Sequence, residues 1–138
     1  MRNVMKPAFL IPALMLCAAS CGRKLPPSAR SADAMVIIAN FTYALKQFEV
    51  DCDRFPSTAE GLNALLTRPA GIPAKSWHGP YLDKVWKDAW GHDFVYCCPG
   101  KHNTNGFDIY SYGPDGVSKS GGEDYDDIAN WWKGHAPP

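Results

Sequence analysis

Four acidic side chains within five residues, Glu123-Asp124-Tyr125-Asp126-Asp127, are the strongest chemical signal in this chain. Carboxylates packed this closely repel one another, and a hard divalent cation relieves that repulsion. Calcium takes about six to eight oxygen ligands and mixes carboxylates with backbone carbonyls. A solvated acidic turn has the same composition, so these residues alone leave calcium binding and an exposed loop as alternatives.

The segment that leads into the acidic cluster has the residues of a sharply turning loop. Phe107–Ser111 has the pattern of a short strand, and Gly113-Pro114-Asp115-Gly116 follows as a turn. These glycines, with Gly121-Gly122, allow backbone carbonyls to point toward an ion. The loop is not an EF-hand, because Val117 and Lys119 stand where that motif places oxygen ligands.

A helix and a small sheet are expected to hold this loop in place. Apolar residues recur three and four positions apart over residues 34–51, which predicts a helix with one apolar stripe facing the core. Strand patterns cover Asp93–Cys98 and Phe107–Ser111, and a third short strand is expected near Ile128–Trp131. The prediction is an α+β fold in which a long N-terminal helix and a short helix pack on a small antiparallel sheet.

The short helix is expected to begin soon after the long one ends. Ser57-Thr58-Ala59-Glu60 fits a capping box, in which the first and last residues exchange side-chain and backbone hydrogen bonds. Leucines follow at helical spacing, so this helix is predicted to run to about Thr67. A loop rich in proline and glycine then leads to the sheet.

Residues 1–20 have the pattern of an export signal. Basic residues begin it, an apolar run follows over residues 8–16, and small residues precede Cys21. The apolar run is shorter than the roughly 20 residues of a membrane span. A cysteine after small residues resembles the lipobox of bacterial lipoproteins, which implies that Cys21 is lipidated. Ala18 stands where that motif prefers leucine, which leaves ordinary cleavage or an uncleaved anchor as alternatives.

The chain is therefore expected to consist of an export signal, a tether and one globular domain. Residues 21–33 hold two prolines and no apolar periodicity, which predicts a tether that lifts a globular domain at 34–138 off the membrane. The chain is therefore expected on the periplasmic side of the cell envelope as a membrane-anchored lipoprotein. Gly22, rather than aspartate, after the lipidated cysteine favours the outer membrane.

Charge and composition argue against several classes of function. Loss of Arg2 and Lys6 with the leader leaves twelve basic and fourteen acidic side chains, without a basic stripe, so nucleic acid is not an expected partner. The chain shows no signature of a nucleophile or of an acid–base pair. Neither catalysis nor a small-molecule substrate is expected.

Cysteines beyond the leader suggest a disulfide. Cys52, Cys97 and Cys98 would all be exported, and disulfides persist outside the cytoplasm. Adjacent residues of a strand point to opposite faces, so only one of Cys97 and Cys98 can readily face Cys52. The sequence predicts one bridge from Cys52 and leaves the choice of partner open.

Several motifs follow one another in a specific order across residues 34–132. They are Ile38-Ala39-Asn40, Arg54-Phe55-Pro56-Ser57, Glu60-Gly61-Leu62, Trp77-His78-Gly79-Pro80-Tyr81-Leu82, Lys87-Asp88-Ala89-Trp90-Gly91, Tyr110-Ser111-Tyr112-Gly113-Pro114-Asp115-Gly116 and Asp127-Ile128-Ala129-Asn130-Trp131. This order resembles the major pseudopilin of the bacterial type II secretion system, the G subunit. The resemblance implies a globular domain behind a long helix, with calcium in its last loop stabilising the fold and the fibre.

The resemblance also implies a ligand set for calcium, drawn from the backbone and from side chains. Its members are the Tyr112 carbonyl, the Asp115 carboxylate, a carbonyl near Val117 or Ser118, and the carboxylates of Asp124 and Asp127, with Asp126 as an alternate. These residues combine the oxygen types that calcium accepts.

The N-terminus departs from the family pattern. A pseudopilin begins with a short basic leader and a continuous apolar helix, whereas this chain shows a lipoprotein-like signal and a Pro-Pro tether. The expected function is a calcium-stabilised, membrane-tethered accessory part of a type II secretion system. Its expected partners are other secretion components or other pseudopilins. The alternative is an envelope lipoprotein that binds its target through calcium and has no role in secretion.

Overall fold

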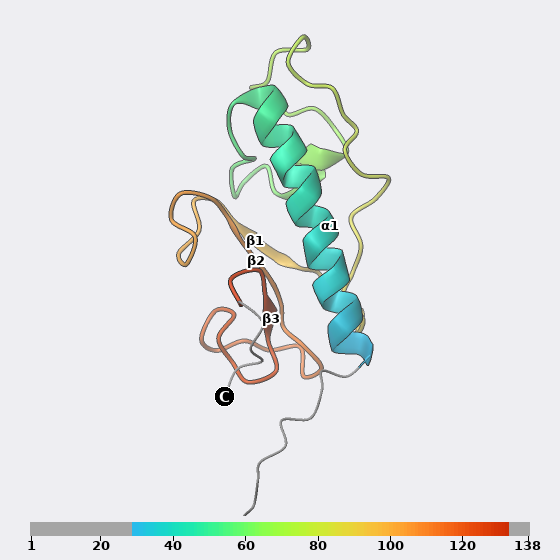
Figure 1. The fold of residues 1–138 in the computed structure, drawn as a ribbon, viewed down its shortest axis with the longest axis vertical. Coiled ribbons are helices and arrows are strands. Elements are labelled where there is room, and N and C mark those ends of the chain that lie inside the picture. The colour runs from blue at the N-terminus through green and yellow to red at the C-terminus, as the bar shows by residue number, and fades with distance from the viewer. Residues whose placement is uncertain (1–28, 133–138) are drawn as a thin grey trace, which may run out of the picture.

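The computed structural model describes residues 29–132, in which one long helix lies along a small sheet and extended loops (Figure 1). In chain order the elements are α1 (Ala29–Cys52), the 3₁₀ helix η1 (Leu62–Leu65), β1 (Val95–Cys97), β2 (Asp108–Ser111) and β3 (Ile128–Ala129). The α+β prediction is confirmed. The export signal, Cys21 and most of the predicted tether lie outside the described residues.

α1 presents one apolar face to the rest of the protein. Phe41, Leu45 and Phe48, spaced as the sequence pattern predicts, are fully buried. The helix begins at Ala29, inside the segment predicted as a tether. Residues 29–33 contain neither glycine nor proline, so nothing local stops the helix from extending past its first core contact at Ala34. Within residues 29–132, no helix combines the length and apolar character needed to cross a bilayer.

The sheet has three strands in the order β1-β2-β3, and both pairings are antiparallel. Its inner face packs on α1, where the ring of Phe41 meets that of Phe94 at a centroid distance of 5.4 Å. Ile109 and Ser111 on β2 are fully buried, while Tyr110 between them is less so. Asp108 departs from the two-residue period expected of a strand with one face on a core, because it is also buried, at 4% exposed.

The short helix differs from its prediction. The capping box forms: Glu60 N donates to Ser57 Oγ at 3.2 Å, and Ser57 N donates to Glu60 Oε2 at 2.7 Å. The helix, however, is only the 3₁₀ turn Leu62–Leu65 rather than an α-helix to Thr67. Gly61 has a φ of 59°, a left-handed conformation that breaks the helical path directly after the box.

Cys52, Cys97 and Cys98 are all free thiols in this structure, so the disulfide predicted from Cys52 is not supported by it. The Cys52 Sγ at the end of α1 lies 3.7 Å from the Ser76 carbonyl oxygen. The Cys98 Sγ instead lies 3.5 Å from the carbonyl oxygen of Gly106, within its own loop. The two thiols therefore face different partners, and Cys97 occupies the outer position of the β1 burial pattern.

Candidate metal centre

The acidic loop connects β2 to β3 and occupies the end of the molecule where α1 begins (Figure 1). The sheet register pairs Ser111 with Ile128. Tyr112 and Asp127 follow and precede this pair directly, so the antiparallel ladder holds the two ends of the loop side by side. Two residues expected as ligands from opposite ends of a sixteen-residue segment, 112–127, are thereby brought together.

Asp127 is the most unusual side chain of the loop, because it is an acid that is 0% exposed. Its Oδ2 accepts hydrogen bonds from Ser118 Oγ at 2.6 Å and from the Asp124 amide at 2.9 Å. Its Oδ1 is buried and has no hydrogen-bond partner. Burial raises the pKa of Asp127, and the charges of Asp124 and Asp126 raise it further. A buried carboxylate oxygen without a partner carries a desolvation cost that a cation would remove.

Three other carboxylates of the loop, those of Asp115, Asp124 and Asp126, bind its own backbone. Asp124 Oδ2 accepts from the Lys119 amide at 2.6 Å, and this bond is the main reason why the pKa of Asp124 is lowered. Asp115 Oδ1 accepts from the Val117 amide at 2.8 Å, while Asp126 Oδ2 accepts from the Asp115 amide at 3.4 Å. These bonds fold residues 112–127 into one unit that carries several acidic groups around a single buried one.

Gly113 allows the two halves of the loop to meet. It has a φ of 69°, and a Cβ at this position would lie 2.1 Å from the carbonyl oxygen of Asp126. Any side chain here would push the Tyr112 side of the loop away from the Asp126 side. Its amide also donates to Ser111 Oγ at 3.0 Å, which anchors the turn to the end of β2. The left-handed glycine turn predicted from the sequence is confirmed at this position.

A buried aspartate outside the loop supports it, and in the sequence this residue stood out only as part of the Lys87–Gly91 motif. Asp88 Oδ2 accepts from Ser111 Oγ at 2.5 Å, and its Oδ1 accepts from the amides of Trp90 and His92. The His92 ring in turn lies against the loop, since a Cβ on Gly116 would be 2.9 Å from it. The Lys87–Gly91 motif was the available signal for this support, although spacing alone did not reveal its partner.

A second support comes from the chain after β3. The Trp131 ring fills the space beside Gly122, where a Cβ would lie 2.5 Å from it. This indole also stacks on the His102 ring at a centroid distance of 4.0 Å. The acidic loop is therefore held between the turn at residues 88–92 and the aromatic pair of His102 and Trp131.

The donor set fits calcium better than a transition metal. In the described part of the chain, no group of three or more histidine, cysteine or acidic side chains is arranged to hold a metal ion. Calcium does not need such a group, because backbone carbonyls supply part of its shell. The free Oδ1 of Asp127 is the one observation here that favours a cation. The predicted ligands Tyr112, Asp115, Val117, Asp124 and Asp126 remain predictions.

The arrangement of α1, the three-stranded sheet and the β2–β3 loop defines a pseudopilin-like α+β domain. The crystal structure of the major pseudopilin from the type 2 secretion system of enterohaemorrhagic Escherichia coli matches it with a TM-score of 0.64 and 30% sequence identity. The match covers 90% of this chain and 98% of that one.

Sequence comparison identifies the family. Residues 24–131 match the family described as type II secretion system (T2SS), protein G, and the chain belongs to that family. The type II secretion system core protein G of Pseudomonas aeruginosa is 42% identical over 109 residues, which are 77% of this chain and 74% of the relative. The Klebsiella pneumoniae protein of the same name is 40% identical over 90 residues, which span only 60% of that relative's length.

Family membership decides two of the expectations from sequence. Proteins of this family are structural components, which confirms the prediction that the chain is not an enzyme. A component of type II secretion belongs to the cell envelope, which confirms the coarse location.

Proposed function

We propose that this chain is a calcium-stabilised, pseudopilin-like component of a type II secretion system, held at the membrane by a lipid anchor. It acts as an accessory, cap or docking element that binds other secretion components or pseudopilins. The observation that carries the calcium part is the buried, unpartnered Oδ1 of Asp127 beside further acidic groups. Positive charge at this point offsets the desolvation of Asp127 and its repulsion by Asp124 and Asp126.

The residues that would hold the ion come from both ends of the loop. Asp127 would offer its free Oδ1, and the neighbouring end of the loop would offer the Tyr112 carbonyl and the Asp115 carboxylate. A carbonyl near Val117 and the carboxylate of Asp124 or Asp126 would complete the set. Bound calcium supplies positive charge without chemistry, so its effect is to fix the loop against the sheet.

Removal of calcium tests the site. The purified full chain is stripped with a chelator and melted, and calcium is then added back in steps. Since only the folded state would hold the ion, about 100-fold excess over Kd should stabilise the protein by roughly 2.7 kcal/mol and raise Tm by several degrees. A melting curve that is the same with chelator and with millimolar calcium rejects the site.

The secretion role has a separate test. A strain that lacks this protein should secrete type II substrates less well, and the tethered domain should retain known secretion components in a pull-down. Unimpaired secretion together with no retained component would leave the fold and the calcium site standing but would reject this role. That result would favour the envelope lipoprotein without a secretion function.

The lipid anchor rests on the sequence of residues 1–21 alone. Mass spectrometry of the protein purified from membranes should find Cys21 as an acylated N-terminus. Ordinary cleavage without acylation, or an intact leader, would show that the anchor is of another kind.

A further inference from the structure

The outer edge of β1 leaves backbone groups unpaired. On β2, Ile109 faces β3, because its carbonyl oxygen accepts from the Asn130 amide and its amide donates to Asn130 Oδ1. Backbone groups alternate in direction along a strand, so Tyr110 faces β1 and its register partner Val95. Tyr96 then directs its N–H and C=O away from β2. Neither group has a hydrogen-bond partner among residues 29–132.

The neighbouring position on the same edge is already occupied by a side chain. Cys98 is two residues past Tyr96, so its backbone groups face the same way. The Cys98 amide donates to Thr58 Oγ1 at 2.9 Å, and this hydroxyl donates to the Cys98 carbonyl oxygen at 3.1 Å. The Thr58 hydroxyl thus forms the two backbone hydrogen bonds at Cys98 that a neighbouring strand would otherwise form. The open length of the edge is limited to Phe94–Tyr96.

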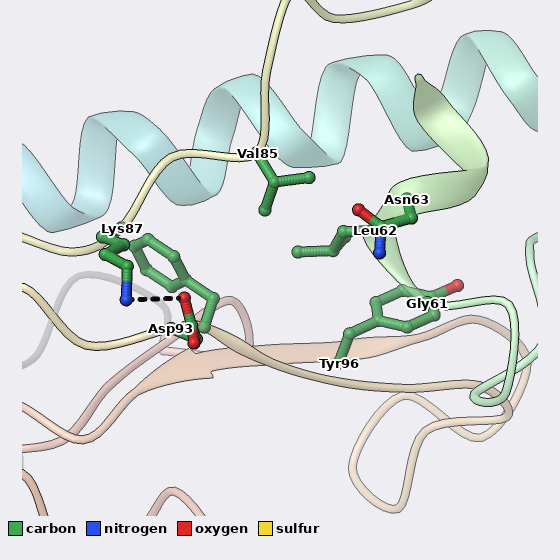
Figure 2. Close-up of a pocket in the computed structure, with 8 residues that line it drawn as sticks. Gly61, Leu62, Asn63, Val85, Lys87, Asp93 and Tyr96 are labelled. Carbon is green, nitrogen blue, oxygen red and sulfur yellow. Dashed lines mark ion pairs between the residues drawn. The ribbon is translucent and has the colours of Figure 1, made fainter. Parts of the chain in front are cut away.

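A groove of about 450 Å³ lies along this open length (Figure 2). Leu62 and Asn63 of η1 form one wall, Val85 forms another, and Phe94 and Tyr96 form the strand side. Figure 2 shows Val85, Leu62 and Tyr96 directed toward a common space in front of α1. A groove of this size is in the range of ligand sites, and it combines apolar walls with free backbone donors and acceptors.

One end of the groove carries both signs of charge. Lys87 Nζ lies 3.2 Å from Asp93 Oδ1, and the two side chains are 61% and 79% exposed. An ion pair this exposed contributes little to stability. It can therefore open at small cost, and either member can pair with a charged group brought by a ligand.

We propose that this groove binds an extended peptide segment of another protein, which adds to the sheet as a strand beside β1. Its backbone pairs with the N–H and C=O of Tyr96. One apolar side chain enters between Leu62 and Val85, and a charged side chain two positions along, on the same face, reaches Lys87 or Asp93. This inference goes beyond the calcium loop and does not depend on it.

The same geometry disfavours a second copy of the chain as the occupant. A β1 strand from another copy would bring its own η1 segment. That segment lines the groove beside the β1 edge that would have to pair. The η1 segments of the two copies would therefore collide before the two β1 edges could pair. A single extended segment has no such obstruction.

Peptide selection followed by NMR tests the proposal. Random octapeptides displayed on phage are selected on the immobilised full chain, and the tightest binder is added to the ¹⁵N-labelled full chain. The largest amide shifts should fall on Phe94–Tyr96 and Asn63, and exchange of the Tyr96 amide should slow. N-methylation of the peptide residue that donates to Tyr96 should weaken binding at least about tenfold, while N-methylation of the next residue should not, because its N–H points away.

Two tryptophan variants provide a matched control. Asn63→Trp fills the groove from an exposed position and should abolish binding, whereas Val50→Trp on the exposed face of α1 should leave it unchanged. The comparison of the two N-methylated peptides uses the unsubstituted protein, so it remains a valid test even if Asn63→Trp perturbs folding. The proposal is overturned by binding that ignores N-methylation, by shifts elsewhere, by enrichment of no peptide, or by self-association that Asn63→Trp abolishes.

Discussion

The α1–sheet core and the acidic loop are stabilised in opposite ways. In the core, Phe41, Leu45 and Phe48 are fully buried against apolar partners, so every group removed from water gains a favourable contact. In the loop, Asp127 is equally buried but leaves one oxygen unpaired. The core is complete with the protein's own atoms, whereas the loop lacks a partner for one of its groups.

This difference indicates that stability is not uniform across the fold. A region with few buried apolar contacts and a costly buried charge opens more easily than a packed core. If calcium closes the loop, it should stabilise residues 112–127 and their supports more than α1. Substitutions in the two regions should therefore differ in how their effects depend on calcium.

Phe48→Ala should cause the largest loss of stability. The ring is fully buried and meets Tyr81 at a centroid distance of 5.7 Å, so truncation leaves a cavity in the core. The free energy of unfolding should fall by about 3–5 kcal/mol, and by the same amount with or without calcium. Chemical denaturation in both conditions measures this.

Tyr43→Ala is the matched control on the same helix. Tyr43 is 70% exposed, so its truncation should change stability by no more than about 0.5 kcal/mol. Equal losses in the two variants would mean that the apolar stripe of α1 is not the packed face.

Asp127→Asn should remove the response to calcium. The amide keeps the shape of the side chain but lacks the charge that attracts the ion, so the gain of roughly 2.7 kcal/mol at about 100-fold excess over Kd should disappear. Without calcium the variant should be at least as stable as the parent, because it no longer buries a charge. Melting with chelator and with calcium measures both effects.

The exposed acid Asp83 provides the control for that experiment. Asp83→Asn makes the same chemical change away from the loop and should retain the full calcium response. A response that survives in Asp127→Asn would place the ion elsewhere.

Gly113→Ala should reduce both stability and calcium affinity. The residue is left-handed, and the added methyl would meet the Asp126 carbonyl oxygen at 2.1 Å. Strain and displacement together should cost roughly 1–3 kcal/mol. Gly91→Ala has a similarly positive φ but open space around its Cβ, so it isolates the backbone strain from the clash. Equal effects of the two changes would show that the crossing at Asp126 does not matter.

The sequence predicted those parts of the fold that depend on periodicity. The spacing of apolar residues in α1 reflects which face is buried, and the strand pattern that covers β2 was also correct. It failed at the short helix, because the single left-handed residue Gly61 overrides the leucine spacing that follows it. The predicted disulfide is unsupported, since Cys52, Cys97 and Cys98 are free thiols and no local pattern encodes the relative position of their segments.

The candidate site was predictable only in part, because local patterns do not encode contacts between distant segments. The acidic cluster and the glycine turns are local features and could be found in the sequence. The support from Asp88 to Ser111 and the stacking of His102 on Trp131 join segments more than twenty residues apart. The burial of Asp127, which distinguishes it from its acidic neighbours, is likewise a property of the assembled fold.

Glu60, unlike Asp127, is an acid whose two carboxylate oxygens both accept hydrogen bonds from within the protein. Arg54 donates to both of its oxygens, at 2.6 and 2.7 Å, and these bonds lower the pKa of Glu60 from 4.5 to about 2. A lowered pKa in the folded state means that the stabilisation is present above pH 4.5 and is lost as pH falls toward 2. The side chains of Arg54 and Glu60 are 39% and 23% exposed, so solvent screening limits the loss to roughly 1 kcal/mol.

Glu60→Gln should therefore lower stability by roughly 1 kcal/mol at pH 7 and flatten its dependence on pH between 4.5 and 2. Glu49→Gln, which alters only an exposed pair with Lys46, should leave that dependence intact. Denaturant titrations at several pH values, all with chelator present, measure both variants. When the titrations are repeated with calcium, the difference in stability between Glu60→Gln and the parent should be unchanged, because the Glu60 oxygens already have protein donors. If added calcium removed the difference in stability between Glu60→Gln and the parent, the division between a self-sufficient core and an ion-dependent loop would not hold.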